Sequence, residues 1–209
     1  MNRLAGVKAD AAYSHKKLEG IADYVRKGLN FGSTEAIDPL RLFEDLHGIS
    51  ITDASGRAIP LRGHVTNLET SEGYARYDAE KRCIEVVAAA TTYEWLEDRH
   101  PRAAFFVAHE LGHCLLHTNQ LMRLAQMPTN QQAAFHRGLT NHKPYEDTEW
   151  QANGFAGALL MPACGLAEME SRYGRLSTIM VQDVFKVSGQ AADYRLQLFQ
   201  SRRHELLAI

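Results

Sequence analysis

The fold of this chain is decided by the segment Phe105-Phe-Val-Ala-His109-Glu110-Leu-Gly-His113-Cys-Leu-Leu-His117. Apolar residues recur in this segment at helical spacing, which predicts a helix with one buried face. We expect the helix to begin at His100-Pro101 and to reach about His117. Four residues of an α-helix advance about 400°, so His109 and His113 lie on one face, one turn apart.

This pair of histidines has the spacing of a zinc-binding motif. Two imidazoles roughly 6 Å apart along a helix can converge on one zinc ion. Glu110 lies about 100° around the helix, beside the ion, where it can accept a proton from the water that the ion activates. His117 extends the row, but its Cα lies about 12 Å from that of His109, so we predict a structural role near the site. Cys114 is predicted to point into the core.

A catalytic zinc site requires a third protein ligand from elsewhere in the fold. Residues 146–161 predict a helix that Pro162 ends, and Glu149 lies on the same face of it as Asn153. We therefore predict Glu149 as the third ligand. Glu146 is the first alternative, and the more distant ones are His142 and His136. A carboxylate ligand also leaves manganese open as the metal.

Two glycines lie inside this second helix. Gly154 and Gly157 each cost about 1 kcal/mol relative to alanine in a helix interior. Their presence indicates the close approach of another helix, which we expect to be the one that carries the histidines.

Outward from these two segments, the chain is mostly helical around a short run of strands. Helices are predicted over about 13–30, from Asp38-Pro39 to Gly48, over Thr92–Asp98, around 119–126 and 130–137, near Leu166–Tyr173, and over 177–186 and 189–203. Alternating residues between Ile49 and Val65, followed by a hairpin over residues 74–88, predict a small antiparallel sheet. This order predicts an α+β fold in one domain, residues 1–209.

Composition places the chain among ordinary globular proteins. Its 209 residues are 45% hydrophobic and 23% charged, with a net charge of −2 that argues against a dedicated nucleic-acid coat. The longest apolar stretches are too short to span a membrane. Residues 1–18 contain no apolar run typical of a secretory signal, so a cytoplasmic location is expected. Three widely spaced cysteines, Cys83, Cys114 and Cys164, are expected to be reduced and buried.

The two motifs together resemble the ImmA/IrrE-type metallopeptidases. The resemblance rests on His109-Glu-Leu-Gly-His113, on Glu149-Trp-Gln-Ala-Asn153-Gly-Phe-Ala156 through Met161-Pro162, and on the tail Phe185–Leu196; it covers about residues 100–200. It implies a zincin-like zinc peptidase with His109, His113 and Glu149 as ligands and Glu110 as the base. It also implies a protein substrate, in characterised members a helix-turn-helix transcriptional repressor cleaved in response to stress or a mobile element.

Two other readings remain open at this stage. Residues 177–200 have the spacing of a helix-turn-helix DNA-binding unit with Arg195 on its second helix, but residues 177–209 have a net charge of only +1, so direct nucleic-acid binding is disfavoured. The chain could also be a toxin or scaffold with an idle or structural zinc, although such a site has no use for Glu110. Candidates for stabilising the oxyanion are Tyr145, His142 and Tyr93.

Overall fold

The computed structural model describes residues 4, 7–53, 55–69, 72–128 and 142–208. Its elements, in chain order, are α1 (His15–Gly28), α2 (Pro39–Glu44), the 3-10 turn η1 (Asp45–Gly48), β1 (Ser50–Thr52), β2 (Ala58–Thr66), β3 (Gly73–Asp78), β4 (Cys83–Ala89), α3 (Ala90–Glu97), α4 (Pro101–Leu116), α5 (Thr118–Gln126), η2 (Pro144–Glu146), α7 (Thr148–Leu160), α8 (Ala163–Tyr173), α9 (Thr178–Phe185) and α10 (Gly189–Leu206). The predicted α+β class is confirmed. The helix expected around 130–137 and the alternative ligand His136 lie outside the described residues.

The sheet forms one side of the molecule and has the strand order β1-β2-β4-β3. The expectation of a purely antiparallel sheet was wrong, because β2 and β4 are parallel, with Leu61 opposite Ile84 and Thr66 opposite Ala89. The β3–β4 hairpin turns its second strand, β4, toward β2, so β4 becomes central and β3 lies at the end of the order. The sequence did carry a sign of this position, since β4 is apolar at almost every residue and buried throughout, as strands covered on both faces are.

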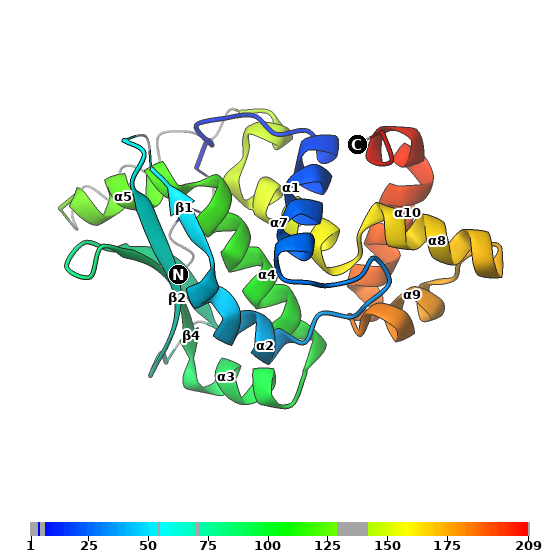
Figure 1. Cartoon of the computed structure of the whole chain (residues 1–209), viewed down its shortest axis with the longest axis horizontal. Helices are drawn as coiled ribbons and strands as arrows, with labels where there is room; N and C mark the ends of the chain where they lie inside the picture. The colour runs from blue at the N-terminus through cyan, green and yellow to red at the C-terminus, as the bar shows by residue number, and fades with distance from the viewer. Residues whose placement is uncertain (1–3, 5–6, 54, 70–71, 129–141, 209) are drawn as a thin grey trace.

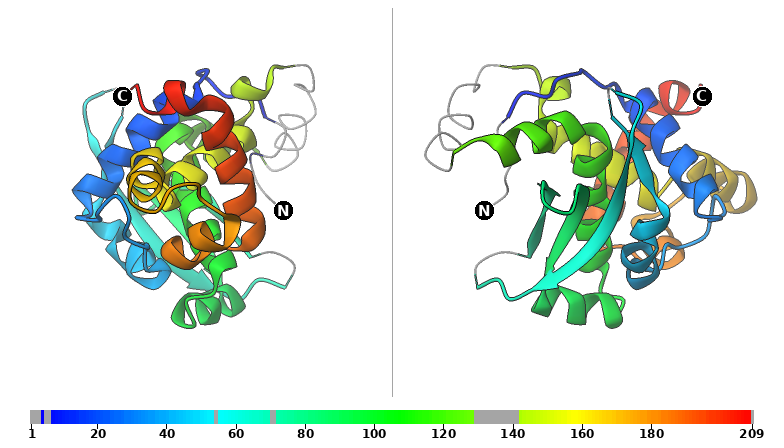
Figure 2. Two further views of the ribbon diagram at one scale, coloured as in Figure 1. Left: turned by 90° about the vertical axis from the view of Figure 1, so that its right-hand side faces the viewer. Right: turned by 60° about the vertical axis from the view of Figure 1, so that its left-hand side comes forward.

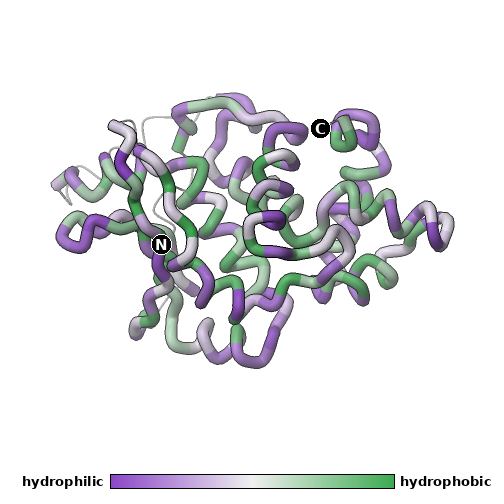
Figure 3. The backbone as a smooth tube through the Cα atoms, viewed as in Figure 1, coloured by the Kyte–Doolittle hydropathy of each residue, from purple (hydrophilic) through white to green (hydrophobic). Residues whose placement is uncertain are grey.

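Helix α4 is the central element between the sheet and the other helices (Figures 1 and 2). Pro101 occupies its first turn, and the His100 side chain accepts a hydrogen bond from the Arg102 N–H, so the start of the helix is fixed locally. One side of α4 packs on β3 and β4, and the other packs on α7. Figure 3 shows hydrophobic colour along these central helices and hydrophilic colour at the tip of the β3–β4 hairpin.

The close contact between α4 and α7 depends on Gly112. A Cβ on Gly112 would lie 3.2 Å from the Ala152 Cα and 3.0 Å from Cδ1 of Phe155, so the missing methyl group lets the two helices approach. The glycines of α7 do not face α4 as we expected. A Cβ on Gly154 would lie 2.7 Å from the Leu18 side chain of α1, and one on Gly157 would lie 3.9 Å from Arg195 of α10.

The C-terminal helices α8, α9 and α10 lie at the end of the molecule away from the sheet (Figure 1). Arg195 of α10 is 2% exposed, and its guanidinium lies 2.5 Å from the Glu19 carboxylate of α1. The same side chain donates to the Met161 carbonyl at 2.7 Å. Arg195 therefore joins three helices inside the protein, where DNA cannot reach it.

Two smaller findings concern the cysteines and the length of the apolar helices. Cys83 and Cys114 are buried as expected, whereas Cys164 is exposed at the start of α8, where the second residue of the helix faces outward. Among the described residues, no helix has both the length and the apolar character needed to cross a bilayer.

Candidate metal centre

Two side chains of α4 and one of α7 converge on a single point between the helices. Nε2 of His109 lies 3.0 Å from Nε2 of His113. The Glu149 carboxylate faces both rings, with Oε2 at 3.3 Å from Nε2 of His109 and Oε1 at 3.1 Å from Nε2 of His113. One ligand atom from each residue lies within 4.8 Å of the other two, and this His-His-Glu set fits a small divalent cation.

The position of Glu149 follows from how α7 begins. The Asp147 side chain accepts a hydrogen bond from the Trp150 N–H at 2.9 Å and caps the helix, which places Glu149 in the first turn. Thr148 is fully buried, and its hydroxyl donates to the Leu4 and Val7 carbonyls. The first turn of α7 is thus tied to the N-terminal segment, and the Glu149 side chain is directed back to α4.

Each histidine also has a partner behind it, which comes from α7 for His109 and is His117 for His113. Nδ1 of His109 lies 3.0 Å from Oδ1 of Asn153, an exposed residue. Nδ1 of His113 lies 3.0 Å from Nδ1 of His117, and Nε2 of His117 lies 3.0 Å from Oε1 of Gln151. The structure therefore places His117 behind His113 and outside the converging set, as its spacing suggested.

The charges of the cluster change the pKa values of its members. Burial alone would raise the pKa of Glu149, but hydrogen bonds and charge interactions with His109 and His113 outweigh it and hold that pKa far below its usual range. Burial lowers the pKa of His109, but Glu149 and Glu110 raise it more, so the net direction is upward. Burial, assisted by the neighbouring His113, lowers the pKa of His117 to about 3, so that ring is neutral near pH 7.

Glu110 lies beside the converging set on α4 and is anchored to the sheet. It is 4% exposed, and its Oε2 accepts a hydrogen bond from the Ala75 N–H of β3 at 2.7 Å. Because β3 ends the strand order, the N–H of Ala75 can be directed at α4 instead of at another strand. The bond occupies one carboxylate oxygen, and the described residues place no partner on the other.

The alternative ligands are engaged elsewhere. The Glu146 carboxylate pairs with Lys8 at 3.1 Å and accepts from the Lys143 N–H, which places it at the N-terminal side of η2. Nε2 of His142 lies 2.9 Å from Oδ2 of Asp147. Neither residue belongs to the converging set that the described residues form.

The three candidates for oxyanion stabilisation are not brought together. Tyr93, on α3, packs edge-on against Phe43 at 6.0 Å between ring centroids. Tyr145 is partly exposed, and its ring lies 5.6 Å from Nζ of Lys143. The described structure thus gives no reason to prefer one of them, and their roles stay predictions.

Sequence reasoning gave no role at the site to three of its partners. Gln151 and Asn153 stand two and four residues after Glu149, and a polar residue at each position of a predicted buried helix could have marked them. Ala75 takes part through its backbone alone, so its side chain gave no signal.

Fold and cluster together define a class of protein: an α+β, zincin-like fold with a candidate metal site between two helices. Residues 96–197 match the peptidase family described as the IrrE N-terminal-like domain, Peptidase M78. The match confirms the resemblance drawn from the two motifs. It includes both α4 and α7, and therefore His109, His113 and Glu149.

Comparison with other proteins adds little to this assignment. No curated protein matches the chain. A solved structure described as a Mycobacterium tuberculosis transcriptional regulator is similar over 88% of this chain, at 19% identity and a TM-score of 0.47. The chain spans about half the length of that protein, 46%.

Proposed function

We propose that this protein is a zinc-dependent metalloendopeptidase that hydrolyses a peptide bond in a protein substrate. The observation that carries the proposal is the convergence of His109, His113 and Glu149 with the Glu110 carboxylate beside them. The peptidase family match over residues 96–197 supports the same class of reaction.

The donor set fits zinc in number and in chemistry. Two imidazole nitrogens and one carboxylate leave a fourth position open, as catalytic zinc sites do. Zinc held by these residues would supply a Lewis acid that makes water nucleophilic near neutral pH. Manganese is the alternative that the carboxylate ligand allows, and elemental analysis of the purified protein distinguishes the two.

Glu110 is the general base in this proposal. The Ala75 N–H fixes one of its oxygens, so the carboxylate is held in place beside the converging set. From there it can accept the proton of the attacking water and deliver it to the leaving amine, a contribution typically worth about 10²–10⁴-fold in rate. A structural metal site has no need of such a group, which argues against an idle zinc.

The substrate class follows from the family resemblance, which points to a helix-turn-helix transcriptional repressor. Arg195, the residue on which the alternative of a DNA-binding unit depends, is buried in an ion pair with Glu19 and is not available to contact DNA. We therefore propose a protein partner that is cut and no direct contact with nucleic acid, in a cytoplasmic setting.

The test is Glu110→Gln with a repressor encoded near this chain's gene as substrate. Glutamine can still accept the Ala75 hydrogen bond, so we expect the variant to keep its fold, its zinc and its substrate binding. We expect the variant to cleave the repressor at least about 10²-fold more slowly than wild type does. Mass spectrometry of the fragments measures both rates.

Wild-type rates in Glu110→Gln would remove Glu110 from the mechanism. A wild-type protein that holds zinc and leaves every candidate repressor intact would contradict the proposed substrate class.

A further inference from the structure

Gln151 has an orientation that the surrounding backbone fixes. Its Nε2 donates to the Ala11 carbonyl at 2.7 Å and to the Tyr145 carbonyl at 2.8 Å. Both N–H groups of the amide are thus used, and a rotated amide would set its oxygen against two carbonyl oxygens. The remaining atom, Oε1, can only accept, and it faces Nε2 of His117 at 3.0 Å.

The fixed amide determines where His117 carries its hydrogen. His117 is 1% exposed, and its hydrogen-bond partners among the described residues are Gln151 and His113, neither of which is a carboxylate. A ring buried in this way is neutral and has one N–H. Because Oε1 of Gln151 accepts, the hydrogen is on Nε2, and Nδ1 of His117 is left as an acceptor.

The same argument then extends to His113. Its Nδ1 lies 3.0 Å from Nδ1 of His117, so a hydrogen bond between them requires the hydrogen to be on His113. With Nδ1 engaged by His117, Nε2 is the ring nitrogen of His113 that faces Nε2 of His109 and Oε1 of Glu149.

We propose that His117 and Gln151 are positioning residues that fix His113 with its hydrogen on Nδ1, so that Nε2 faces the converging set as a ligand. The inference rests on the proposed function only in taking His113 as a metal ligand. Residues behind a ligand commonly set its tautomer in this way, and their loss typically weakens metal binding by about 10–100-fold.

The arrangement starts in the N-terminal segment, far from the histidines in sequence. Ala9 donates its N–H to the Glu146 carbonyl, and Thr148 donates its N–H to the Val7 carbonyl. These bonds hold residues 7–9 antiparallel to the start of α7 and bring the Ala11 carbonyl to Gln151. The orientation of His113 therefore depends on backbone groups of residues 11 and 145.

His109 offers a contrast within the same site. Its partner Asn153 is exposed, and no hydrogen bond of the described residues fixes the Asn153 amide from the other side. Of the two histidines, His113 is thus the one that a continuous set of hydrogen bonds constrains, through the buried residues His117 and Gln151.

The direct test is long-range ¹⁵N–¹H NMR of the histidine rings in the full-length, metal-free protein, with assignments from single-histidine variants. We expect a protonated Nδ1 on His113, a bare Nδ1 on His117 and a protonated Nε2 on His117. A bare Nδ1 on His113, or a protonated Nδ1 on His117, would overturn the proposal. The measurement needs neither metal nor substrate, so it can fail or succeed independently of peptidase activity.

Zinc affinity of variants gives a second readout, measured by competition with a chromophoric chelator. We expect His117→Phe and Gln151→Met each to weaken zinc binding about 10–100-fold. His117→Asn places an oxygen near the former Nδ1 position and should recover part of the loss. The matched control is Thr118→Val, which removes the buried hydroxyl bond to the Cys114 carbonyl one residue away and should bind zinc as wild type does.

The outcomes separate a positioning role from a structural one. Equal weakening in His117→Phe, His117→Asn and Thr118→Val would show that the helix junction is merely disturbed, and would overturn the proposal. Unchanged affinity in His117→Phe would also overturn it. Absence of zinc binding in the wild type would refute the proposed function and leave the NMR result to decide the tautomer.

Discussion

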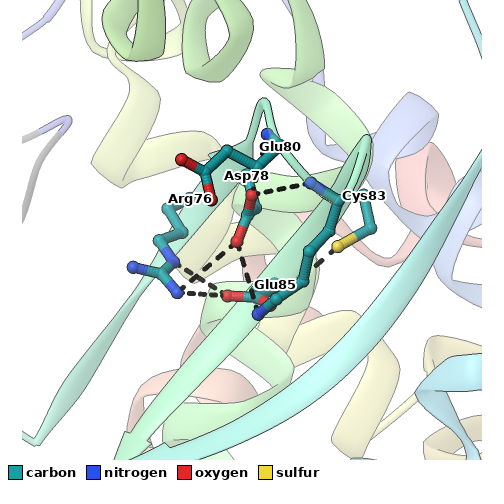
Figure 4. A network of polar contacts seen from close by, with 6 residues as sticks. Arg76, Asp78, Glu80, Cys83 and Glu85 are labelled. Atoms are coloured by element: carbon teal, nitrogen blue, oxygen red, sulfur yellow. Dashed lines mark hydrogen bonds and ion pairs between the residues drawn. The ribbon is translucent and has the colours of Figure 1, made fainter.

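Glu149 and Glu85 lie in clusters of similar size and opposite chemistry. Glu85 of β4 is 2% exposed, and its carboxylate accepts from the Arg76 guanidinium at 2.6 Å and the Lys81 ammonium at 2.9 Å, with Asp78 and Cys83 close by (Figure 4). Glu149 of α7 faces the imidazoles of His109 and His113 at 3.3 and 3.1 Å.

The two carboxylates differ in the hydrogen-bonding groups that their partners direct at them. Arginine and lysine offer only N–H groups, so around Glu85 charge and hydrogen bonding are satisfied within the protein. A neutral imidazole can turn a lone pair toward a carboxylate, which leaves a place for a cation between them. An acidic residue among histidines is therefore a candidate ligand, and one among permanent cations is a structural group.

Zinc binding should separate the two clusters most strongly. We expect Glu149→Gln to weaken zinc binding more than about 100-fold, beyond the effect of losing an indirect partner, because a charged ligand is removed. Glu85→Gln should leave the affinity unchanged. Chelator competition on both purified variants measures the ratio, and a large loss in Glu85→Gln would break the comparison.

The free energy of unfolding of the metal-free protein should be lowered more by Glu85→Gln than by Glu149→Gln, the reverse of the order for zinc binding. Glu85→Gln removes the buried carboxylate that pairs with Arg76 and Lys81, so we expect the free energy of unfolding to fall by about 1–3 kcal/mol. Glu149→Gln should lower it less, because the Glu149 side chain is 25% exposed whereas that of Glu85 is 2% exposed. Urea denaturation of both variants provides the values, and equal losses would contradict the distinction.

The smallest expected effect is on the pH dependence of the free energy of unfolding. Burial raises the pKa of Glu85, but hydrogen bonds from Lys81 and Arg76 outweigh it and hold the pKa below its ordinary 4.5. A carboxyl group with a lowered pKa stabilises the fold above its unfolded pKa, and that stabilisation is lost as the pH falls through the folded pKa.

We therefore expect the stability difference between wild type and Glu85→Gln to be full above about pH 4.5 and to shrink as the pH falls further. Urea midpoints measured at intervals between pH 7 and pH 3 test this. A difference that grows with acidity would mean that Glu85 is not stabilised by its cations.

The sequence predicted elements whose signals are local. The helical spacing around His109 and His113, the cap Asp38-Pro39 and the hairpin over residues 74–88 all appear in the structure, because each depends on neighbours within a few residues. The α+β class followed from the order of these elements. That Glu149 shares a helix face with Asn153 is again a local property, and its role as a ligand stays a prediction.

What the sequence could not predict depends on contacts across the chain. The parallel pairing of β2 with β4 is a matter of strand order, which alternation within a strand does not encode. Gly154 faces α1 instead of α4 because the packing of three helices, and not the glycine itself, chooses the neighbour. Gln151 looks like any polar helix residue until the Ala11 carbonyl, 140 positions earlier, is seen to fix it.

The distance between Ala11 and Gln151 along the chain has a consequence for synthesis. A ribosome releases the N-terminal segment first and α4 later, and α7 emerges only after both. During that interval the nascent chain carries His109 and His113 on one helix without Glu149, and without the amide that orients His117. The site is thus assembled only when residues from both halves of the chain meet, so an unfinished chain carries the pair of histidines without the rest of the converging set.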